Sequence, residues 1–389
     1  MTVITDIEDL RILAERRVPR MFYNYCDSGS WTEQTYAANE SDFEKIWLRQ
    51  KVARNMENRS LETTMVGEKM KMPVVLAPVG STGMQHADGE ILACRAAHDF
   101  GVQFTLSTMS VCSVEDVAEY VERPFWFQLY VMRDREFTGR LIDRAKAAGC
   151  SALVLTLDLQ ILGQRHKDLK NGLSVPPKPT LPNLINLATK LPWCMKMLKT
   201  KRRTFRNIVG HVDGVKDTRD LALWAAEMFD PKLCWDDISW IKDRWGGKLI
   251  LKGIIDAEDA ELAARSGADA LIVSNHGGRQ LDGALSSIQA LPEIVAAVGD
   301  KIEVHLDSGI RSGQDVLKAR ALGAKGTYIG RAFVYGLGAM GQRGVTKALE
   351  IIEKELDLSM AFTGDTNIEN TGRHTVILPS DRSQMVLGD

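Results

Sequence analysis

The segment ALIVSNHGG, residues 270–278, decides the fold because its character changes abruptly along its length. Its first half is a run of aliphatic residues, which is typical of a strand that is buried on both faces. The run ends in Ser274 and His276, and two glycines then let the chain turn closely. A buried strand that ends in polar residues is what a parallel α/β sheet presents at the edge that carries its site.

Seven further apolar runs of this kind recur along the chain. They are VVLAP (74–78), QFTLS (103–107), FWFQLY (125–130), ALVLTLD (152–158), KLILKG (248–253), IEVHLDSG (302–309) and GTYIGR (326–331). Most gaps between them have apolar residues every three or four positions, which predicts helices; the clearest are GEILACRAAHDFG, TGRLIDRAKAAGC, AEDAELAARSGAD and GQDVLKARALGAK. This alternation predicts an α/β fold with a parallel sheet, and eight strands close into a (β/α)8 TIM barrel. An open doubly wound sheet is the competing architecture.

Polar residues stand where the runs end. They are Ser107, Gln128 with Tyr130, Thr156 with Asp158, Lys252, Ser274 with His276, Asp307 and Arg331. A barrel brings the carboxyl ends of all its strands to one face, so we expect these side chains to form a single ring-shaped site.

The composition is that of a globular protein, with 44% hydrophobic and 26% charged residues among 389. We expect one domain over residues 1–389, with a helical segment before the barrel. The net charge of −2 gives no reason to expect nucleic acid as a partner. The six cysteines are scattered without metal-ligand spacing, so we expect no metal site and a reducing compartment. The charged N-terminus and the lack of a spanning apolar run predict a cytoplasmic protein.

A long insertion, about residues 168–232, separates the fourth and fifth predicted strands. Its first part is rich in lysine, arginine and leucine, and it contains no acidic residue from position 169 to 212. Basic and apolar residues interleaved in this way suit the surface of an anionic membrane. We therefore expect membrane contact through residues 178–206, on the inner face of the cytoplasmic membrane. The alternative is a solvated active-site lid.

The loop SNHGGRQLDG, residues 274–283, carries the expected chemistry. A neutral imidazole at His276 can take a proton from an alcohol, and the guanidinium of Arg279 can hold a carboxylate with two hydrogen bonds. That pair is what oxidation of a 2-hydroxy acid requires. Asp158 is placed to orient the imidazole and to stabilise its charged form. Arg165 is either a second cation for the carboxylate or a solvated loop residue, and His305 is interpreted as a core residue.

A phosphate site is predicted after the last two strands, where TIM barrels commonly bind phosphate. LDSGIRSG (306–313) and IGRAF (329–333) supply Gly309, Arg311, Gly330 and Arg331. Lys252 has two interpretations: it forms a Schiff base, as in a non-redox barrel lyase, or it remains cationic and stabilises negative charge on a reduced flavin. GLGAMG (336–341) matches the dinucleotide fingerprint, but it does not follow a strand directly, so we expect a close-packed helix start there.

These motifs together resemble the FMN-dependent L-2-hydroxy acid dehydrogenases and oxidases. The resemblance rests on SNHGGRQLDG, LDSGIRSG, IGRAF, WFQLYV and MPVVLAPVG, and it extends from about residue 6 to residue 370. Within that family the chain is most similar to the bacterial respiratory L-lactate dehydrogenases, through LRQKVARNM, SLETT, FTLSTMSVC and GRAFVYGL. The resemblance implies a TIM barrel that uses FMN to oxidise a small L-2-hydroxy acid.

The resemblance also implies a role for each matched position. His276 would be the catalytic base and Asp158 its partner. The substrate would be bound by Tyr25, Tyr130, Arg165 and Arg279. FMN would be held by Ala77, Pro78, Val79, Ser107, Gln128, Thr156, Lys252, Ser274, Asp307, Gly309, Arg311, Gly330 and Arg331.

The resemblance leaves the substrate and the electron acceptor open. L-Lactate is the leading substrate and a quinone the leading acceptor, but an oxidase that uses oxygen on lactate, mandelate or a longer 2-hydroxy acid is an alternative. Met109 stands where glycolate oxidase-like members have tryptophan, and Gly80 stands where many members have alanine. Met109 argues against a substrate pocket identical to that of the glycolate oxidase-like members, and Gly80 leaves more room near the flavin for bulkier substrate side chains. A homotetramer is expected by analogy alone, and a non-catalytic protein tethered by its basic loop is the furthest alternative.

Overall fold

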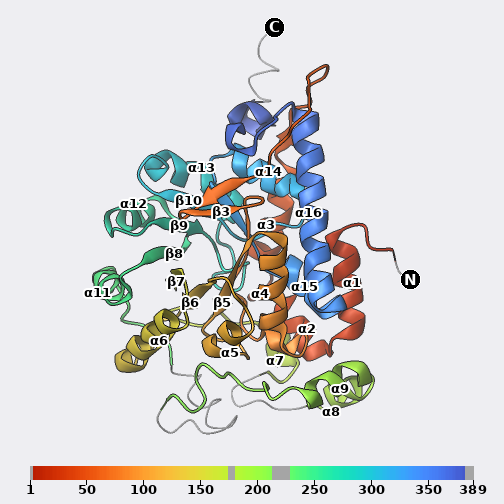
Figure 1. The fold of residues 1–389 in the computed structure, drawn as a ribbon, viewed down its shortest axis with the longest axis vertical. Coiled ribbons are helices and arrows are strands. Elements are labelled where there is room, and N and C mark those ends of the chain that lie inside the picture. Colours follow the sequence, from red (N-terminus) through yellow and green to blue (C-terminus); the bar gives the residue numbers. More distant parts are fainter. Residues whose placement is uncertain (1–2, 174–179, 213–227, 382–389) are drawn as a thin grey trace.

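Eight parallel strands close into a barrel in the computed structural model, which describes residues 3–173, 180–212 and 228–381 (Figure 1). The strands are β4 (Val74–Leu76), β5 (Gln103–Ser107), β6 (Trp126–Leu129), β7 (Ala152–Thr156), β8 (Lys248–Ile254), β9 (Ala270–Val273), β10 (Glu303–Leu306) and β11 (Gly326–Ile329). Each pairs with the next along the chain, and β11 pairs with β4. Each strand coincides with one of the predicted runs, so the TIM barrel is confirmed and the open sheet was the wrong alternative.

Helices follow the strands and surround the barrel (Figure 1). They are α4 (Gly89–Phe100), α5 (Val114–Glu119), α6 (Arg135–Ala147), α11 (Asp236–Trp245), α12 (Ala257–Arg265), α13 (Ser287–Val298), α14 (Gly313–Ala321), α15 (Arg331–Met340) and α16 (Gln342–Thr363). Local sequence sets several of their starts. Ser113 and Ser312 each form a capping box with the aspartate three residues later, and Asp134 and Asp256 cap α6 and α12.

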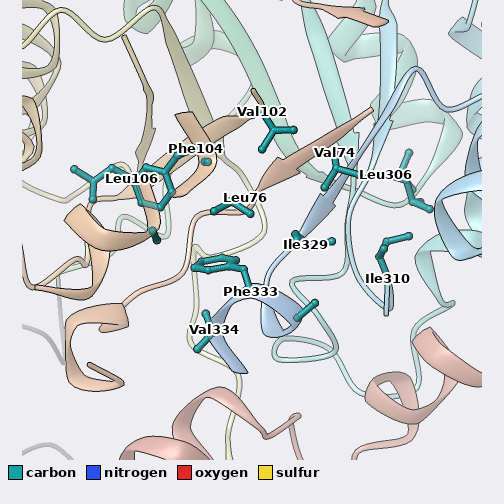
Figure 2. Close-up of a cluster of buried hydrophobic side chains, with 14 of the residues drawn as sticks. Val74, Leu76, Val102, Phe104, Leu106, Leu306, Ile310, Ile329, Phe333 and Val334 are labelled. Carbon is teal, nitrogen blue, oxygen red and sulfur yellow. The ribbon is translucent and has the colours of Figure 1, made fainter. Parts of the chain in front are cut away.

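The apolar core has two layers, because successive strand residues point to opposite faces of the sheet. Figure 2 shows Leu76, Phe104 and Ile329 on the outer face of the barrel, close to Phe333 of α15. The neighbouring strand positions point into the barrel, where Val75, Ala77, Trp126, Val154, Ile250, Ile272 and Tyr328 form a second buried cluster. The barrel is therefore a filled core, and open space begins only at the carboxyl ends of its strands.

The opposite end of the barrel is closed by a hairpin of β2 (Thr63–Met65) and β3 (Glu68–Met70). Glu68 accepts hydrogen bonds from Trp126 Nε1 and from Ser151 Oγ, both at 2.8 Å. His305 is fully buried inside the barrel, 3.1 Å from Glu303 Oε2 and 3.3 Å from the Tyr328 hydroxyl. This location agrees with its interpretation as a core residue.

Three N-terminal helices precede the barrel: α1 (Ile7–Arg17), α2 (Arg20–Cys26) and α3 (Gln34–Glu44). α1 packs against α15 and α16 (Figure 1). α2 lies across the carboxyl end of the barrel, where Met21, Phe22 and Tyr25 line the cavity described below. A small sheet of β1 (Trp47–Leu48) and β12 (Val376–Ile377) joins the two ends of the chain.

The expected insertion contributes α7 (His166–Lys170), α8 (Leu181–Ala188) and α9 (Leu191–Lys199). Parts of it, residues 174–179 and 213–227, lie outside the described residues. α8 and α9 sit at the lower edge of the molecule in Figure 1, beside α2. No helix in the described ranges is both long and apolar enough to cross a bilayer.

The segment GLGAMG forms the end of α15 and the turn into α16 rather than a phosphate loop. A Cβ on Gly336 would collide with the backbone of Gly344, so glycine at both positions lets these two helices approach closely. The expectation of a close-packed helical segment is met, although the segment ends α15 instead of starting it.

Candidate active site

A cavity of about 500 Å³ lies at the carboxyl ends of the barrel strands. Many residues that the sequence marked as site residues line it: Tyr25, Ala77, Pro78, Val79, Tyr130, Arg165, Lys252, His276, Arg279, Asp307, Gly309, Arg311, Gly330 and Arg331. The remaining marked residues, Ser107, Gln128, Thr156, Asp158 and Ser274, lie behind this lining and are hydrogen-bonded to one another or to lining residues. The structure thus brings the whole predicted set to one end of the barrel.

His276 and Asp158 form a hydrogen-bonded pair at the centre of the cavity. Nδ1 of His276 lies 2.9 Å from Oδ1 of Asp158, and the backbone N–H of His276 donates to Ser274 Oγ at 3.1 Å. A carboxylate can only accept, so Nδ1 carries the proton and Nε2 presents a lone pair. The Tyr130 hydroxyl lies 3.5 Å from that Nε2. The pair therefore holds an imidazole with a basic nitrogen directed away from its carboxylate partner.

Burial keeps the imidazole neutral. It lowers the pKa of His276 below the ordinary value of 6.5, against the charge of Asp158, which acts in the opposite direction. Burial also opposes ionisation of Asp158, but the His276 ring and its hydrogen bond outweigh this effect and lower the pKa of the carboxyl. A neutral imidazole beside an ionised carboxylate is the protonation state that a general base requires.

Two arginines flank Tyr25 on one side of the cavity. The guanidinium carbons of Arg279 and Arg165 lie 4.8 and 5.4 Å from the centre of the Tyr25 ring. Arg279 also donates to the backbone carbonyls of Tyr25 and Ser28. Burial and the nearby charge of Arg165 lower the pKa of Arg279 to about 10. Two cations held this close together create a strong site for a carboxylate anion.

Asp168 is a site residue that sequence reasoning missed. Its Oδ2 accepts from Arg165 Nε at 2.6 Å, and its side chain is only 8% exposed. Oδ1 of Asp168 is buried and has no hydrogen-bond partner among the described residues. This carboxylate fixes the position of Arg165, which the sequence could not show because a carboxylate three residues after an arginine is common on any surface helix.

Lys252 also lines the cavity and forms a buried trio with Asp307 and Ser274. Its Nζ is 3.0 Å from Asp307 Oδ2 and donates to Ser274 Oγ at 2.9 Å. Burial works against the charge of Lys252, but Asp307 and Asp158 outweigh it and raise the pKa of the amine. The amine is therefore protonated and not nucleophilic, which argues against the Schiff-base interpretation.

Buried hydroxyl and amide groups form a row behind the cavity lining. Ser107 donates to Gln128 Oε1 at 3.1 Å, and Gln128 Nε2 donates to Thr156 Oγ1 at 3.0 Å. The three residues come from the adjacent strands β5, β6 and β7. They form a polar strip that can hydrogen-bond to the edge of a planar heterocycle.

The far end of the cavity combines two arginines with two glycines. Gly309 has φ of 87°, and a Cβ there would collide with the Asn39 carbonyl. Arg311 is paired with Glu40 at 2.8 Å. Arg331 begins α15 and donates to the carbonyls of Cys26 at 3.0 Å and Ser28 at 2.8 Å. This end is cationic, as a phosphate site needs.

The space beside Gly330 indicates that the residues present fit FMN. A Cβ built on Gly330 would meet only Val79 Cγ2, at 3.6 Å, and Ala77 Cβ, at 3.8 Å. It would therefore occupy cavity space between those residues instead of colliding with the wall. Glycine keeps that space free beside the helix N-terminus of α15, where a phosphate is bound favourably.

Apart from Met109, the apolar part of the lining was not predicted as a site. It includes Met21, Phe22, Met84, Met109, Leu159, Leu162, Leu173, Phe205, Met228 and Phe229. Phe229 packs edge-on against Tyr130, with ring centres 5.3 Å apart. Some of these residues come from α2 and others from the insertion, so no strand-end pattern could mark them. In the described ranges no cluster of ligands suited to a metal ion occurs.

Comparison with known proteins gives a consistent result. The sequence profile of FMN-dependent dehydrogenases matches residues 14–378. An L-lactate dehydrogenase of Haemophilus influenzae is 46% identical over 367 residues, which cover 94% of this chain and 96% of that protein. An L-lactate dehydrogenase of Pectobacterium atrosepticum is 44% identical over 381 residues, which cover 98% of each. The crystal structure of the monotopic membrane protein (S)-mandelate dehydrogenase superposes with a TM-score of 0.91, at 33% identity, over 97% of this chain and 100% of that one.

Proposed function

The chain belongs to the FMN-dependent dehydrogenase family, and we propose that it oxidises L-lactate to pyruvate and passes the electrons to a quinone. The observation that carries this proposal is the His276–Asp158 pair, which faces two buried arginines in one cavity. A base and a carboxylate-binding site in one cavity are what a 2-hydroxy acid substrate demands.

Arg279 binds the substrate carboxylate, assisted by Arg165 and by the Tyr25 hydroxyl. The arginine fork matches the two carboxylate oxygens, and desolvation of the site strengthens the interaction. Asp168 keeps Arg165 in place through their 2.6 Å ion pair. Tyr130, whose hydroxyl lies 3.5 Å from His276 Nε2, donates a hydrogen bond to the substrate oxygen beside the base.

His276 Nε2 takes one proton from the substrate as the alcohol carbon becomes a carbonyl carbon. Asp158 stabilises the resulting imidazolium through the bond to Nδ1. FMN, when bound, accepts the two electrons that the substrate loses.

The chain's own residues supply the cofactor site. Lys252 contributes a permanent positive charge, and Arg311 and Arg331 contribute cations at the phosphate end. The remaining holding residues are Ala77, Pro78, Val79, Ser107, Gln128, Thr156, Ser274, Asp307, Gly309 and Gly330.

An anaerobic absorbance experiment tests the proposal. Purified protein should be yellow, and L-lactate should bleach the flavin band rapidly. Bleaching only by another 2-hydroxy acid would overturn lactate as the substrate and keep the chemistry. A colourless protein that cannot be reconstituted with FMN would overturn the assignment of the cofactor site.

A bulkier 2-hydroxy acid is a second candidate substrate. A Cβ on Gly80 would lie 3.2 Å from the Tyr25 hydroxyl oxygen and 3.3 Å from Met109 Cβ, so glycine leaves room beside the substrate position. The similarity to (S)-mandelate dehydrogenase points in the same direction. The relative bleaching rates by L-lactate and by (S)-mandelate separate the two candidates.

We further propose that α8 and α9 rest on the inner face of the cytoplasmic membrane. Their outward side, called the α8–α9 face below, exposes Leu181, Leu184, Ile185, Leu191, Met195 and Leu198. Lys190, Lys196 and Lys199 lie on or beside α9, and such cations attract anionic lipid headgroups. The proposed homotetramer rests on analogy with the family alone.

A further inference from the structure

We propose that one apolar part of the active-site cavity is the route by which a lipid-soluble quinone reaches the reduced flavin. Met21, Phe22 and Met84 are apolar residues of the cavity lining, and this part of the lining is called the apolar arm. The inference rests on the proposed function, because it requires a reduced flavin and a quinone acceptor.

The polar parts of the cavity already have occupants. The arginine pair and His276 suit the substrate anion, and the end with Lys252, Arg311 and Arg331 suits the cofactor. The apolar arm offers thioether and aromatic surface with no charged side chain of its own. Such a surface contributes little to binding a small hydrophilic anion, whereas a methylated ring with an isoprenoid tail is stabilised by burial against it.

The apolar arm shares its wall with the membrane-facing helices. Trp193 of α9 stacks on Phe22, with ring centres 5.3 Å apart and planes inclined by 26°. The Trp193 indole N–H donates to the Met84 carbonyl at 3.0 Å. Phe22 and Met84 therefore have the cavity on one side and the base of α9 on the other.

α8 is hydrogen-bonded to α2, the helix that contributes Met21 and Phe22 to the apolar arm. The backbone N–H of Arg20 donates to Asn186 Oδ1 at 2.8 Å, and the Arg20 guanidinium donates to Asn183 Oδ1 at 3.0 Å. α2 is thus fixed between the cavity and the α8–α9 face. A quinone that leaves the bilayer along this face meets the apolar arm without crossing a layer of charged side chains on α2, whose residues after Arg20 are uncharged.

The redox balance of the step is complete. The reduced cofactor would supply two electrons to the quinone, whose two carbonyls become hydroxyls with the two protons that lactate gave up, one of them the proton held by His276. The substrate supplies the electrons in the preceding half-reaction, so no further reductant is needed.

The test uses the holoenzyme in detergent micelles, so that membrane binding does not limit the result. The arm variant is Met21→Gln/Met84→Gln, which keeps side-chain length and adds two amides. The matched control is Met195→Gln, since Met195 is 57% exposed on the α8–α9 face and does not line the cavity. A hydroxyquinoline N-oxide, which resembles a quinone but is not reduced, serves as the binding probe and is followed by the flavin difference spectrum.

Because each buried amide lacks a partner in an apolar site, the arm variant should bind the probe roughly tenfold or more weakly. Reoxidation of the lactate-reduced enzyme by a ubiquinone with a decyl tail should slow to a similar extent. Bleaching by L-lactate and reoxidation by ferricyanide should equal those of the wild type, and the control should behave as wild type throughout.

Two outcomes would overturn the inference. One is unchanged probe binding and quinone reoxidation in the arm variant. The other is a changed KM for L-lactate or (S)-mandelate with unchanged quinone kinetics, which would make the arm a substrate pocket. Failure of the proposed function is distinguishable, because a wild-type flavin that L-lactate does not bleach can still be titrated with the probe.

Discussion

The active-site cavity has two walls that are built differently. The wall of strand ends is polar, and its groups are fixed in short hydrogen-bonded sets such as His276 with Asp158 and Lys252 with Asp307. The wall formed by α2 and the insertion is largely apolar and is attached to the barrel by contacts far apart in the sequence, such as the hydrogen bond from Trp193 to the Met84 carbonyl. The polar wall carries the proposed chemistry, and the apolar wall carries the proposed contacts with the membrane and the quinone.

Replacement of the catalytic base should cause the largest loss of activity. It should affect the chemistry of the strand-end wall and leave membrane binding unchanged. His276→Gln should lower the rate of flavin bleaching by L-lactate by roughly 10²–10⁴-fold, because proton transfer loses its base. FMN content and sedimentation with anionic liposomes should not change. Stopped-flow absorbance measures the rate. Rapid bleaching by this variant would show that the base lies elsewhere.

Negative charges introduced on the α8–α9 face should weaken membrane binding and leave catalytic turnover unchanged. Leu191 and Leu198 are 64% and 71% exposed, and burial of a leucine contributes about 1.5–3 kcal/mol. Leu191→Glu/Leu198→Glu should therefore weaken liposome binding by roughly 100-fold or more, with normal turnover of a soluble dye. Leu358→Glu, on α16 at 45% exposure, is the control. If wild-type protein does not sediment with anionic liposomes, the membrane proposal is wrong.

A substitution of Asp168 tests the region where the two walls meet. Asp168 lies on α7, which follows strand β7, and its carboxylate holds Arg165 in place. Asp168→Asn should raise the KM for L-lactate about tenfold with a smaller change in kcat, since the ion pair that positions Arg165 is lost. Asp168→Glu should restore part of the affinity. Equal losses in kcat and kcat/KM would instead place the residue in transition-state stabilisation. A melting curve controls for the buried cation left behind.

The smallest expected effect is that of pH on the rate of flavin bleaching. Because burial lowers the pKa of His276, the imidazole stays neutral as pH falls to its ordinary value of 6.5, and the bleaching rate should decline only below it. The charge of Asp158 raises that pKa, so Asp158→Asn should move the acidic limb to still lower pH. A pH series of bleaching rates measures both. A limb that moves upward in this variant would contradict the assignment of the pair.

Sequence predicted the wall of strand ends and, apart from Tyr25, missed the wall formed by α2 and the insertion, for a physical reason. Barrel closure forces strand ends to converge, so polar residues such as Lys252 and Asp307 could be assigned to one site before any distance was known. Asp168 and Met84 carry no such signal, because their roles depend on which loop folds back onto which strand. The insertion was recognised from composition, but its helices and their attachment to α2 follow from contacts such as Trp193 to Met84.

The N-terminal helices also affect the order in which the enzyme can be assembled. Gly309 packs against the Asn39 carbonyl, Ser30 N–H donates to Gly278 O at 2.8 Å, and Arg331 donates to Cys26 O. These helices are synthesised before the strands that precede their partners, so they can make these contacts only after the last three strands have been synthesised. Such distant pairings make folding slow, and the emerging N-terminal segment must wait with apolar surface uncovered. A nascent chain would acquire its cofactor as a late event, after most of the barrel has closed.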